Sequence, residues 1–383
     1  MNCIEYQFEE VVTLFDKQRI PLSSMERAKR QGKYRYYGAQ GIIDYIDDYI
    51  FDGEYLLLAE DGENLKSNKQ DLAQLVDGKF WVNNHAHILR TKGVCRLRYF
   101  YYWINSKNMA EYVTGSAQPK LSQASLKKMS IPLPSLDVQD RILSVITPID
   151  EKIKENTRIN ENLQEQARSI FQSWFIDYEP FGGSAPSDWQ SSTLGQVAIM
   201  KTDSWSPAKN SDVEVEHYSI PAYDEQHYPV FEIASGIKSN KYLLTSDSVM
   251  ISKLNPDKKR IWRPMCLSEH PVCSTEFIVY EANKKGQRDY IYSLIDSIPF
   301  FNHLCSHTTG STNSRQRATP KATLDFSFIL PPDNVIEDFC HIVTPMYDLI
   351  ATNSIENQSL AKTRDSLLPR LMSGELDVSD LDL

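Results

Sequence analysis

The sequence predicts an α+β fold that is built twice in tandem, each copy being an irregular globule of strands and turns followed by one long helix. Two observations support this prediction: motifs recur at a nearly constant offset, and two segments carry apolar residues at helical spacing. The chain has 383 residues, of which 41% are hydrophobic. That length suits two or three domains of roughly 150 residues, and that composition is sufficient for packed cores.

A repeat extends over the length of the chain. Residues 131–134 (Ile-Pro-Leu-Pro) reappear as 328–331 (Phe-Ile-Leu-Pro), and residues 145–149 (Val-Ile-Thr-Pro-Ile) reappear as 342–346 (Ile-Val-Thr-Pro-Met), both 197 positions further on. One match of this kind can arise by chance. Matches in the same order at one offset indicate a tandem duplication.

The duplication predicts four segments. Each globule contains short strand-like runs separated by polar turns, and a linker rich in proline and glycine joins the first helix to the second globule. The predicted boundaries are 1–131 for the first globule, 132–178 for the first helix region, 179–331 for the linker and second globule, and 332–383 for the second helix region with an acidic tail.

Each predicted helix carries a seam of coiled-coil type. Thr147 and Pro148 look like an N-cap residue followed by proline at the first helical position, which predicts a first helix over 148–175. At 1.5 Å per residue that helix would be about 42 Å long. Side chains that advance by three or four residues form the two seams. They are Ile149, Ile153, Asn156, Asn160, Leu163, Ile170, Met346, Ile350, Asn353, Asn357, Leu360 and Leu367.

Two asparagines occupy each seam at positions where apolar residues would be expected. Asn156 and Asn160 in the first helix match Asn353 and Asn357 in the second. These residues either lie at the solvated margin of the seam, or they pair across packed helices and fix the register at some cost in stability. The sequence leaves both interpretations open.

The formal charge of −10 is unevenly distributed along the chain. A negative net charge argues at first against nucleic-acid binding, because phosphate contacts need Lys and Arg. However, residues 1–131 carry 18 basic and 16 acidic side chains, and residues 191–331 carry 15 of each. The helix regions and the tail therefore hold the whole deficit, and the charge of the globules does not exclude DNA.

Basic side chains in the globules alternate with aromatic and amide side chains. Arg and Lys can contact phosphates or guanine, and Gln and Asn can read adenine. The dipeptides Gly115-Ser116 and Gly310-Ser311 precede two such clusters at equivalent places, which favours a shared function over a merely solvated loop. The predicted DNA contacts are Lys33, Arg35, Gln118, Lys120, Lys258, Arg260, Arg315 and Arg317.

No familiar catalytic or metal-binding motif is present. The sequence lacks the Asn/Asp-Pro-Pro-aromatic loop of an N-methyltransferase and the Gly-x-x-x-x-Gly-Lys-Ser/Thr loop of an ATPase. His85 and His87, and the Cys/His groups within 266–273 and 303–307, lack a four-ligand spacing, so packing roles are favoured. We therefore predict a chain without catalytic residues and without a metal.

The sequence also predicts a cytoplasmic location. Its start lacks a basic region followed by an apolar stretch, and no apolar run approaches the ~18–20 residues of a membrane helix. The six cysteines are scattered without a Cys-x-x-Cys pair, which is typical of proteins in a reducing compartment.

Several motifs resemble the DNA-specificity subunit of type I restriction–modification systems. They are Gly-Ser-Ala-Gln-Pro-Lys-Leu-Ser at 115–122, Ile-Pro-Leu-Pro at 131–134, Arg-Ile-Asn-Glu-Asn-Leu at 158–163, and Arg-Asp-Ser-Leu-Leu-Pro-Arg-Leu-Met-Ser-Gly-Glu-Leu at 364–376. The resemblance covers both copies of the repeat. The second copy departs from the first at 312–315, where Thr-Asn-Ser-Arg replaces Ala-Gln-Pro-Lys, so its contacts need not be equivalent.

The resemblance implies a non-catalytic adaptor with two target recognition domains, each of which reads half of a bipartite site in double-stranded DNA. It implies that the two helices pack as an antiparallel coiled coil, set the spacing and give the chain pseudo-two-fold symmetry. The implied partners are two modification subunits, which methylate adenine with S-adenosylmethionine, and restriction subunits, which hydrolyse ATP with Mg²⁺. The chain itself would bind no cofactor.

Two alternatives remain open. A specificity subunit of a type IIB-like restriction–methylation enzyme would have the same sequence plan. A stand-alone metal-dependent nuclease would need an acidic site within 191–331, for which Asp257 and Glu281 are the available carboxylates.

Overall fold

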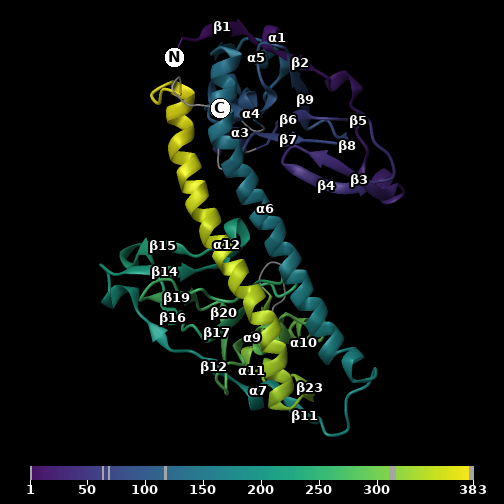
Figure 1. Cartoon of the computed structure of the whole chain (residues 1–383), viewed down its shortest axis with the longest axis vertical. Helices are drawn as coiled ribbons and strands as arrows, with labels where there is room; N and C mark the ends of the chain where they lie inside the picture. The colour runs from purple at the N-terminus through teal and green to yellow at the C-terminus, as the bar shows by residue number, and fades with distance from the viewer. Residues whose placement is uncertain (1, 63, 68–69, 116–118, 310–315, 379–383) are drawn as a thin grey trace. The chain divides into compact units, whose positions relative to one another are not determined.

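The chain folds into two compact units. The computed structural model describes residues 2–62, 64–67, 70–115, 119–309 and 316–378. Unit 1 consists of Met1–Ile153 with Ser359–Leu383, and unit 2 consists of Lys154–Gln358. The two longest helices, α6 (Leu136–Phe175) and α12 (Asp333–Ser373), are divided between the units, so each unit contains one globule and a segment of each helix (Figure 1).

Unit 1 contains three antiparallel or mixed sheets with the strand orders β1-β10, β2-β9-β6-β7 and β4-β3-β8-β5. Helix α4 packs against the second of these sheets. The elements are β1 (Ile4–Gln7), α1 (Phe8–Val11), β2 (Val12–Leu14), α2 (Ser24–Ala28), β3 (Gln31–Gly38), β4 (Gly41–Ile46), β5 (Phe51–Asp52), β6 (Tyr55–Ala59), α3 (Asn64–Ser67), β7 (Ala73–Val76), β8 (Lys79–Val82), β9 (Ala86–Thr91), α4 (Leu97–Asn105), α5 (Gln123–Leu126) and β10 (Ser130–Leu133).

Unit 2 contains sheets with the strand orders β11-β23, β12-β20-β17-β18, β13-β16-β19-β14-β15 and β21-β22. Its elements are β11 (Gln190–Thr193), α7 (Leu194–Val197), β12 (Ala198–Lys201), β13 (Ser204–Trp205), β14 (Glu214–Tyr218), α8 (Ile220–Gln226), β15 (Val230–Ile233), β16 (Lys241–Leu243), β17 (Ser248–Ser252), β18 (Ile261–Trp262), β19 (Pro271–Ser274), β20 (Phe277–Ala282), α9 (Arg288–Asp296), α10 (Ile298–Ser306), β21 (Thr308–Thr309), β22 (Arg317–Ala318), α11 (Pro320–Thr323) and β23 (Ser327–Leu330).

The two globules repeat one strand plan. In each, the first strand pairs antiparallel with the strand just before the long helix, β1 with β10 and β11 with β23. The order β2-β9-β6 in unit 1 corresponds to β12-β20-β17 in unit 2. Strand β3 pairs antiparallel with β4 and parallel with β8, as β14 pairs with β15 and β19. The predicted α+β class and the internal repeat are confirmed.

Within each unit the segments of α6 and α12 run antiparallel. In unit 2, Asn156 contacts Asn357 and Asn160 contacts Asn353, so the partner's number falls as the number along α6 rises. In unit 1, Asp150 pairs with the Arg364 guanidinium at 3.0 Å. The predicted antiparallel arrangement of the helices is therefore present in each unit.

Both asparagine pairs are hydrogen-bonded across the two helices. Asn156 is fully buried and donates to the side chains of Asn357 at 2.9 Å and Glu356 at 2.7 Å. Asn353 is buried and donates to Asn160 at 2.8 Å. These contacts are those of the paired interpretation, in which amides hydrogen-bond across a helix interface, although the Oδ1 of Asn156 has no hydrogen-bond partner among the described residues.

The first long helix begins earlier than the sequence predicts. Helix α6 starts at Leu136, so Pro148 lies inside the helix and does not begin it. A proline inside a helix costs about 3 kcal/mol, because one main-chain hydrogen bond is lost. Ile142 and Ile146 precede Pro148 and are buried in the core of unit 1 together with Leu371 of α12. Their burial offsets the cost of the proline.

The fully buried seam differs from the predicted one toward the end of α6. Phe171 and Phe175 of α6 are buried against Phe339 and Val343 of α12, whereas the predicted seam residues Leu163 and Ile170 are half-buried. A straight helix with 3.6 residues per turn drifts from a 3.5-residue repeat, which moves the buried face onto the next residue. The other predicted apolar seam residues are also half-buried. They are Ile149, Ile153, Met346, Ile350, Leu360 and Leu367.

Among the residues that the structure describes, no helix combines the length and the apolar composition that crossing a membrane requires.

Candidate nucleic-acid interface

Each globule contains a β-hairpin pairing that flanks the sequence segment with one of the Gly-Ser motifs. In unit 1, Thr114 and Lys120 exchange two main-chain hydrogen bonds of 2.8 Å each. In unit 2, β21 pairs with β22, joining Thr309 to Arg317. The tips between these pairs include residues 116–118 and 310–315, which lie outside the described residues, as do the predicted contacts Gln118 and Arg315.

The same main-chain hydrogen bonds attach both hairpins to their globules. In unit 1 the Leu121 N–H donates to the Glu60 carbonyl at 2.8 Å, and Asp61 bridges to Lys120. In unit 2 the Ala318 N–H donates to the Lys253 carbonyl at 2.9 Å, and Leu254 bridges to Arg317. Lys120 and Arg317 therefore occupy equivalent positions, one residue before the point of attachment.

Both of these basic side chains lie at the surface and pair with a carboxylate. The Lys120 ammonium is 3.1 Å from Glu60. The Arg317 guanidinium contacts Glu276 at 3.0 Å and 3.1 Å, and the pair raises the pKa of Arg317. The two side chains remain 54% and 48% exposed, so each cation is positioned by the globule and still accessible to solvent.

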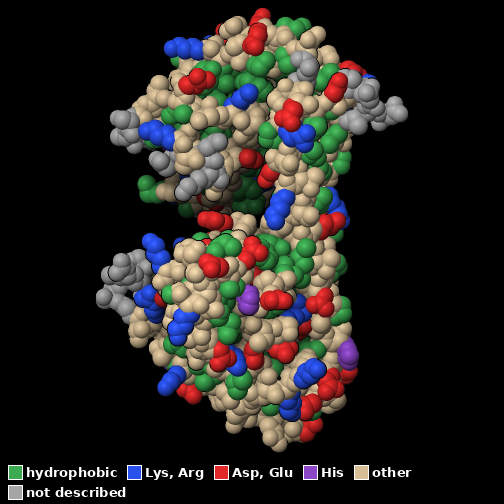
Figure 2. All heavy atoms as spheres, turned by 90° about the vertical axis from the view of Figure 1, so that its left-hand side faces the viewer, with side chains coloured by type: hydrophobic (Ala, Val, Ile, Leu, Met, Phe, Trp, Pro, Cys, Tyr) green, Lys and Arg blue, Asp and Glu red, His purple; other side chains and the backbone are tan. Residues whose placement is uncertain are grey.

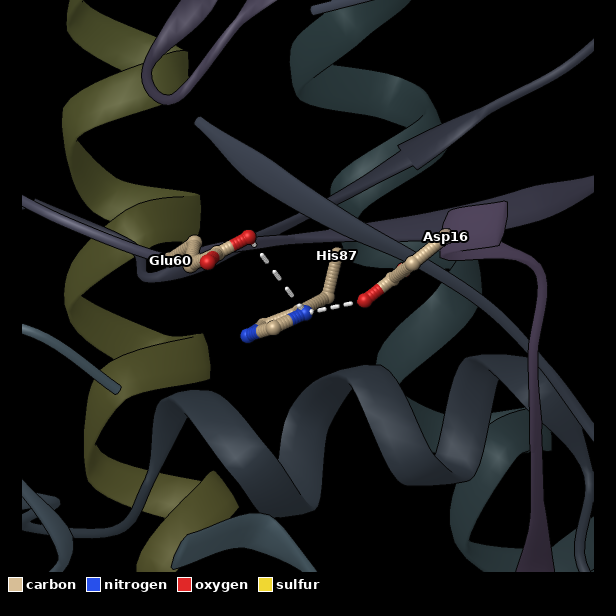
Figure 3. Close-up of side chains that lie close together, drawn as sticks. All are labelled: Asp16, Glu60 and His87. Carbon is tan, nitrogen blue, oxygen red and sulfur yellow. Dashed lines mark hydrogen bonds and ion pairs between the residues drawn. The ribbon is translucent and has the colours of Figure 1, made fainter. Parts of the chain in front are cut away.

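A buried ionic cluster lies below Lys120. Asp16 and Glu60 both face Nδ1 of His87, at 2.6 Å and 3.8 Å (Figure 3). The other ring nitrogen, Nε2, is 2.7 Å from the carbonyl oxygen of Leu121, where the hairpin is attached. Both ring nitrogens of His87 therefore have oxygen partners.

Basic side chains complete this cluster. Arg19 contacts Glu60 at 2.7 Å and approaches Asp16 at 3.6 Å. Burial opposes the ionisation of Asp16, but hydrogen bonds from His87, from the Ile88 main chain and from Gln123 outweigh it and lower the pKa of Asp16. The hairpin of unit 1 therefore rests on a charged and hydrogen-bonded network.

The cluster does not have the character of a metal site. Asp16, Glu60 and His87 are the one group of three His, Cys, Asp or Glu side chains in the described part of the chain whose ligand atoms lie within 4.8 Å of one another. However, the Glu60 carboxylate already forms ion pairs with Arg19 and Lys120, and both ring nitrogens of His87 already have hydrogen-bond partners. A cation would have to displace these partners, and metal-bound histidine is neutral.

Comparisons with known proteins agree with this geometry. Residues 4–165 match the family model described as "Type I restriction modification DNA specificity domain". The specificity subunit of type I restriction enzyme MjaIX from Methanocaldococcus jannaschii is 26% identical over 309 residues, which cover 74% of this chain and 70% of the relative. The HindI specificity subunit from Haemophilus influenzae is 23% identical over 340 residues, which cover 70% of this chain and 74% of the relative.

The chain is therefore similar to type I restriction–modification DNA specificity subunits, over residues 4–165 in the family model and over 74% and 70% of its length in these two relatives. Its fold is similar to that in the crystal structure of a type I S subunit from M. genitalium, with a TM-score of 0.64, 15% identity, and coverage of 97% of this chain and 96% of that one. These findings favour the specificity-subunit interpretation over the type IIB-like and nuclease alternatives.

The predicted contacts on β3 lie beside aromatic rings. Lys33 is exposed, with its ammonium 5.4 Å from the centre of the Tyr34 ring. Arg35 lies 5.7 Å from the Tyr37 ring and donates a hydrogen bond to the Asp77 carbonyl oxygen. Both sites combine a cation with an aromatic face, an arrangement that suits phosphates and bases alike.

The two predicted contacts near β18 differ in accessibility. Lys258 is exposed in the turn before this strand. Arg260 is buried, and its guanidinium makes a bidentate pair with Asp224 at 2.6 Å and 2.8 Å. The bidentate pair joins the buried Arg260, which precedes β18, to the exposed Asp224 of α8, so Arg260 links these two elements. Its guanidinium does not lie free at the surface.

Charged side chains of both signs are interspersed on the face that Figure 2 shows, over both units. This distribution agrees with the near-neutral charge of the two globules in the sequence.

The side chains proposed for a nuclease or a zinc site are not brought together within the described residues. Glu281 accepts hydrogen bonds from Thr245 at 2.7 Å and Ser248 at 3.0 Å, and Asp257 is exposed in a turn. Neither carboxylate belongs to a three-ligand group, and the Cys/His groups around Cys273 and Cys305 do not form one either.

Sequence reasoning missed the carboxylates that position the hairpins. Asp16 directly follows residues 11–15, which are apolar except for Thr13, and Glu60 directly follows the buried strand β6. An acidic residue that continues an apolar strand is a signal of a buried ionic partner. That signal does not identify the partner, because His87 is 71 residues from Asp16 in the chain.

Proposed function

We propose that each unit of this specificity subunit reads one half of a bipartite site in double-stranded DNA. The observation that supports the proposal most strongly is the repeated hairpin, with Lys120 and Arg317 at equivalent and solvent-accessible positions. Two equivalent reading surfaces in one chain fit a DNA site made of two separate parts.

The proposed DNA contacts are the accessible cations of the two globules. Lys120 and Arg317 at the hairpins, Lys33 beside Tyr34, and Lys258 in its turn would contact phosphates or base edges. Arg35 would contribute to DNA binding together with the neighbouring Tyr37 ring. We do not include Arg260, since it is committed to Asp224.

The long helices would set the spacing between the half-sites and bind protein partners. A helix of 40 residues, such as α6, is about 60 Å long, compared with roughly 34 Å for one turn of B-DNA. The helix regions and the tail carry the negative charge of the chain, which disfavours contact with phosphate and leaves their surfaces for protein.

The proposed partners are two modification subunits and the restriction subunits, acting in the cytoplasm on cellular DNA. These partners would bind S-adenosylmethionine, ATP and Mg²⁺, and the chain would contribute specificity without catalysis. Incubation of the purified chain alone with plasmid DNA and Mg²⁺ should leave the DNA intact. Cleavage that is lost in Asp257→Ala or Glu281→Ala would favour a nuclease instead.

The decisive experiment is to coexpress the chain with its modification subunit and map the methylated adenines. We expect every methylated site to contain two short specific sequences separated by a nonspecific spacer of fixed length. Methylation at a continuous, unsplit sequence would contradict the proposal.

A further inference from the structure

Unit 2 contains a cavity that DNA reading does not explain. Its volume is about 660 Å³, which lies within the range of about 300–1,000 Å³ that is typical of ligand sites. Its walls are segments of α6 and α12 on one side, and α8 with the residues around β18 on the other. All of its lining residues belong to unit 2, between Thr157 and Gln358.

One wall of the cavity is aromatic. The rings of Tyr223 and Trp262 are 5.1 Å apart and nearly perpendicular, and Tyr223 and His227 are 4.1 Å apart. Burial lowers the pKa of His227 in spite of the nearby Asp224, which keeps its imidazole neutral. Neutral aromatic faces of this kind attract cations through the ring quadrupole.

The same wall contains an unsatisfied donor. Trp262 is only 5% exposed, and its indole N–H has no hydrogen-bond partner among the described residues. A buried N–H without an acceptor costs about 1–3 kcal/mol, so it is unusual in a native structure. An occupant with an acceptor such as a carbonyl oxygen would remove this cost.

The charges that line the cavity leave carboxylates in excess. The two guanidiniums, Arg168 and Arg263, are committed to Asp296 at 2.7 Å and to Asp289 at 2.6 Å. Glu161 and Glu165 are exposed one helical turn apart on α6 and line the cavity.

Neither of these two glutamates has a salt bridge or a hydrogen bond within the described ranges of the chain. Glu165 acts on Arg168 only through its charge, which contributes to the raised pKa of that guanidinium. The unpaired carboxylates at the cavity therefore attract a cation and repel a phosphate.

We propose that this cavity receives an arginine-bearing segment of a protein partner, and in the proposed function that partner is the modification subunit. A guanidinium can stack on the half-buried Tyr223 ring while it pairs with Glu161 and Glu165. A main-chain carbonyl of the same segment would accept the Trp262 N–H. An arginine anchored in an aromatic pocket is a common centre of a protein interface.

The test compares three variants of the full chain with the wild type in assembly with the purified modification subunit, measured by analytical ultracentrifugation. Glu161→Gln/Glu165→Gln removes both carboxylates, and Trp262→Phe keeps an aromatic ring but removes the N–H. The matched control, Asp212→Asn/Glu214→Gln, removes two exposed charges from the globule of unit 2, outside the cavity and outside the long helices.

We expect the Glu161→Gln/Glu165→Gln variant to weaken assembly about tenfold or more, and Trp262→Phe to weaken it about fivefold, with the control unchanged. The weakening in the glutamine variant should shrink as salt is raised. Equal affinity of the glutamine variant and the control would overturn the proposal, as would a gain in assembly.

The outcomes also separate this inference from the proposed function on which it rests. If the wild-type chain does not bind the modification subunit at all, the proposed function fails. If the wild type assembles and directs methylation to a split site, and the cavity variants do so equally well, only the cavity proposal fails. Weaker DNA binding of the free variant chain, without a change in assembly, would assign the cavity to DNA and overturn the proposal.

Discussion

The two hairpins are attached to their globules by equivalent main-chain hydrogen bonds, but the side chains at the attachment points carry opposite charges. The Glu60 N–H donates to the His85 carbonyl at 2.9 Å in unit 1, and the Lys253 N–H donates to the Glu276 carbonyl at 2.9 Å in unit 2. Glu60 and Lys253 thus hold equivalent positions with opposite charge. Because strand pairing uses only the main chain, the duplicated frame persists while the side chains on it diverge.

The difference continues below the hairpins. Thr91 of β9 and Ala282 of β20 are equivalent, because each pairs with the first residue of the neighbouring strand, Val12 of β2 and Ala198 of β12. His87 and Ile278 lie four residues before them and are therefore also equivalent. His87 is buried in an ionic network, whereas Ile278 is buried in the apolar core of unit 2. The hairpin of unit 1 therefore rests on an ionic network, and the hairpin of unit 2 rests on apolar packing.

The largest expected effect is the loss of the ionic support in unit 1. His87→Leu leaves the buried Asp16 carboxylate without its main partner, and we expect the free energy of unfolding of unit 1 to fall by about 3–5 kcal/mol. Ile278→Val, at the equivalent position, should cost only about 0.5–1.5 kcal/mol in unit 2. Hydrogen exchange followed by mass spectrometry on peptides from β9 and β20 measures both. Similar losses for the two variants would contradict the distinction.

The ionic support should also depend on pH. The folded-state pKa of Asp16 is lowered, so its ionised form stabilises the fold above the unfolded pKa of about 4, and this contribution is lost as pH falls through the folded pKa. We expect Asp16→Asn to lower the free energy of unfolding by about 1–3 kcal/mol at pH 7 and by much less at pH 2. Urea denaturation of variant and wild type at both pH values gives the difference. A constant difference would show that ionisation of Asp16 does not matter.

The helix crossing in unit 2 offers a third comparison. Asn156→Leu alone leaves the amide of Asn357 without its partner, and we expect the free energy of unfolding to fall by about 1–3 kcal/mol. Asn156→Leu/Asn357→Leu replaces both partners by apolar side chains and should recover most of that loss. A thermal-unfolding double-mutant cycle measures the coupling between the two positions. Additive effects of the two substitutions would argue against an energetically coupled pair.

The smallest effect on stability is expected at the hairpin cations. Lys120→Gln and Arg317→Gln remove exposed ion pairs, which contribute about 0–1 kcal/mol. If the two cations contact phosphates, each substitution should weaken DNA binding at all sequences and reduce the slope of log affinity against log salt by about one. Fluorescence anisotropy at several salt concentrations tests this, with the exposed Lys209→Gln as a control. An unchanged slope for both variants would remove Lys120 and Arg317 from the interface.

Local pattern was sufficient to predict the repeat and the two long helices. The Gly-Ser motifs align Lys120 with Arg315 in the sequence, whereas the structure makes Lys120 equivalent to Arg317, since each lies one residue before the point where its hairpin is attached. The start of α6 was mispredicted at Pro148, because a local helix signal was outweighed by the burial of Ile142 and Ile146 in a distant core.

The sequence by itself determined the duplicated α+β plan, since periodicity and repeated motifs are properties of neighbouring residues. Only the tertiary structure decided which charges meet: that Arg260 is buried against Asp224, that His87 joins Asp16 and Glu60, and that the seam asparagines pair. Each of these contacts joins residues far apart in the chain. Its energy depends on burial and on the geometry of the partner, and neither is contained in local sequence.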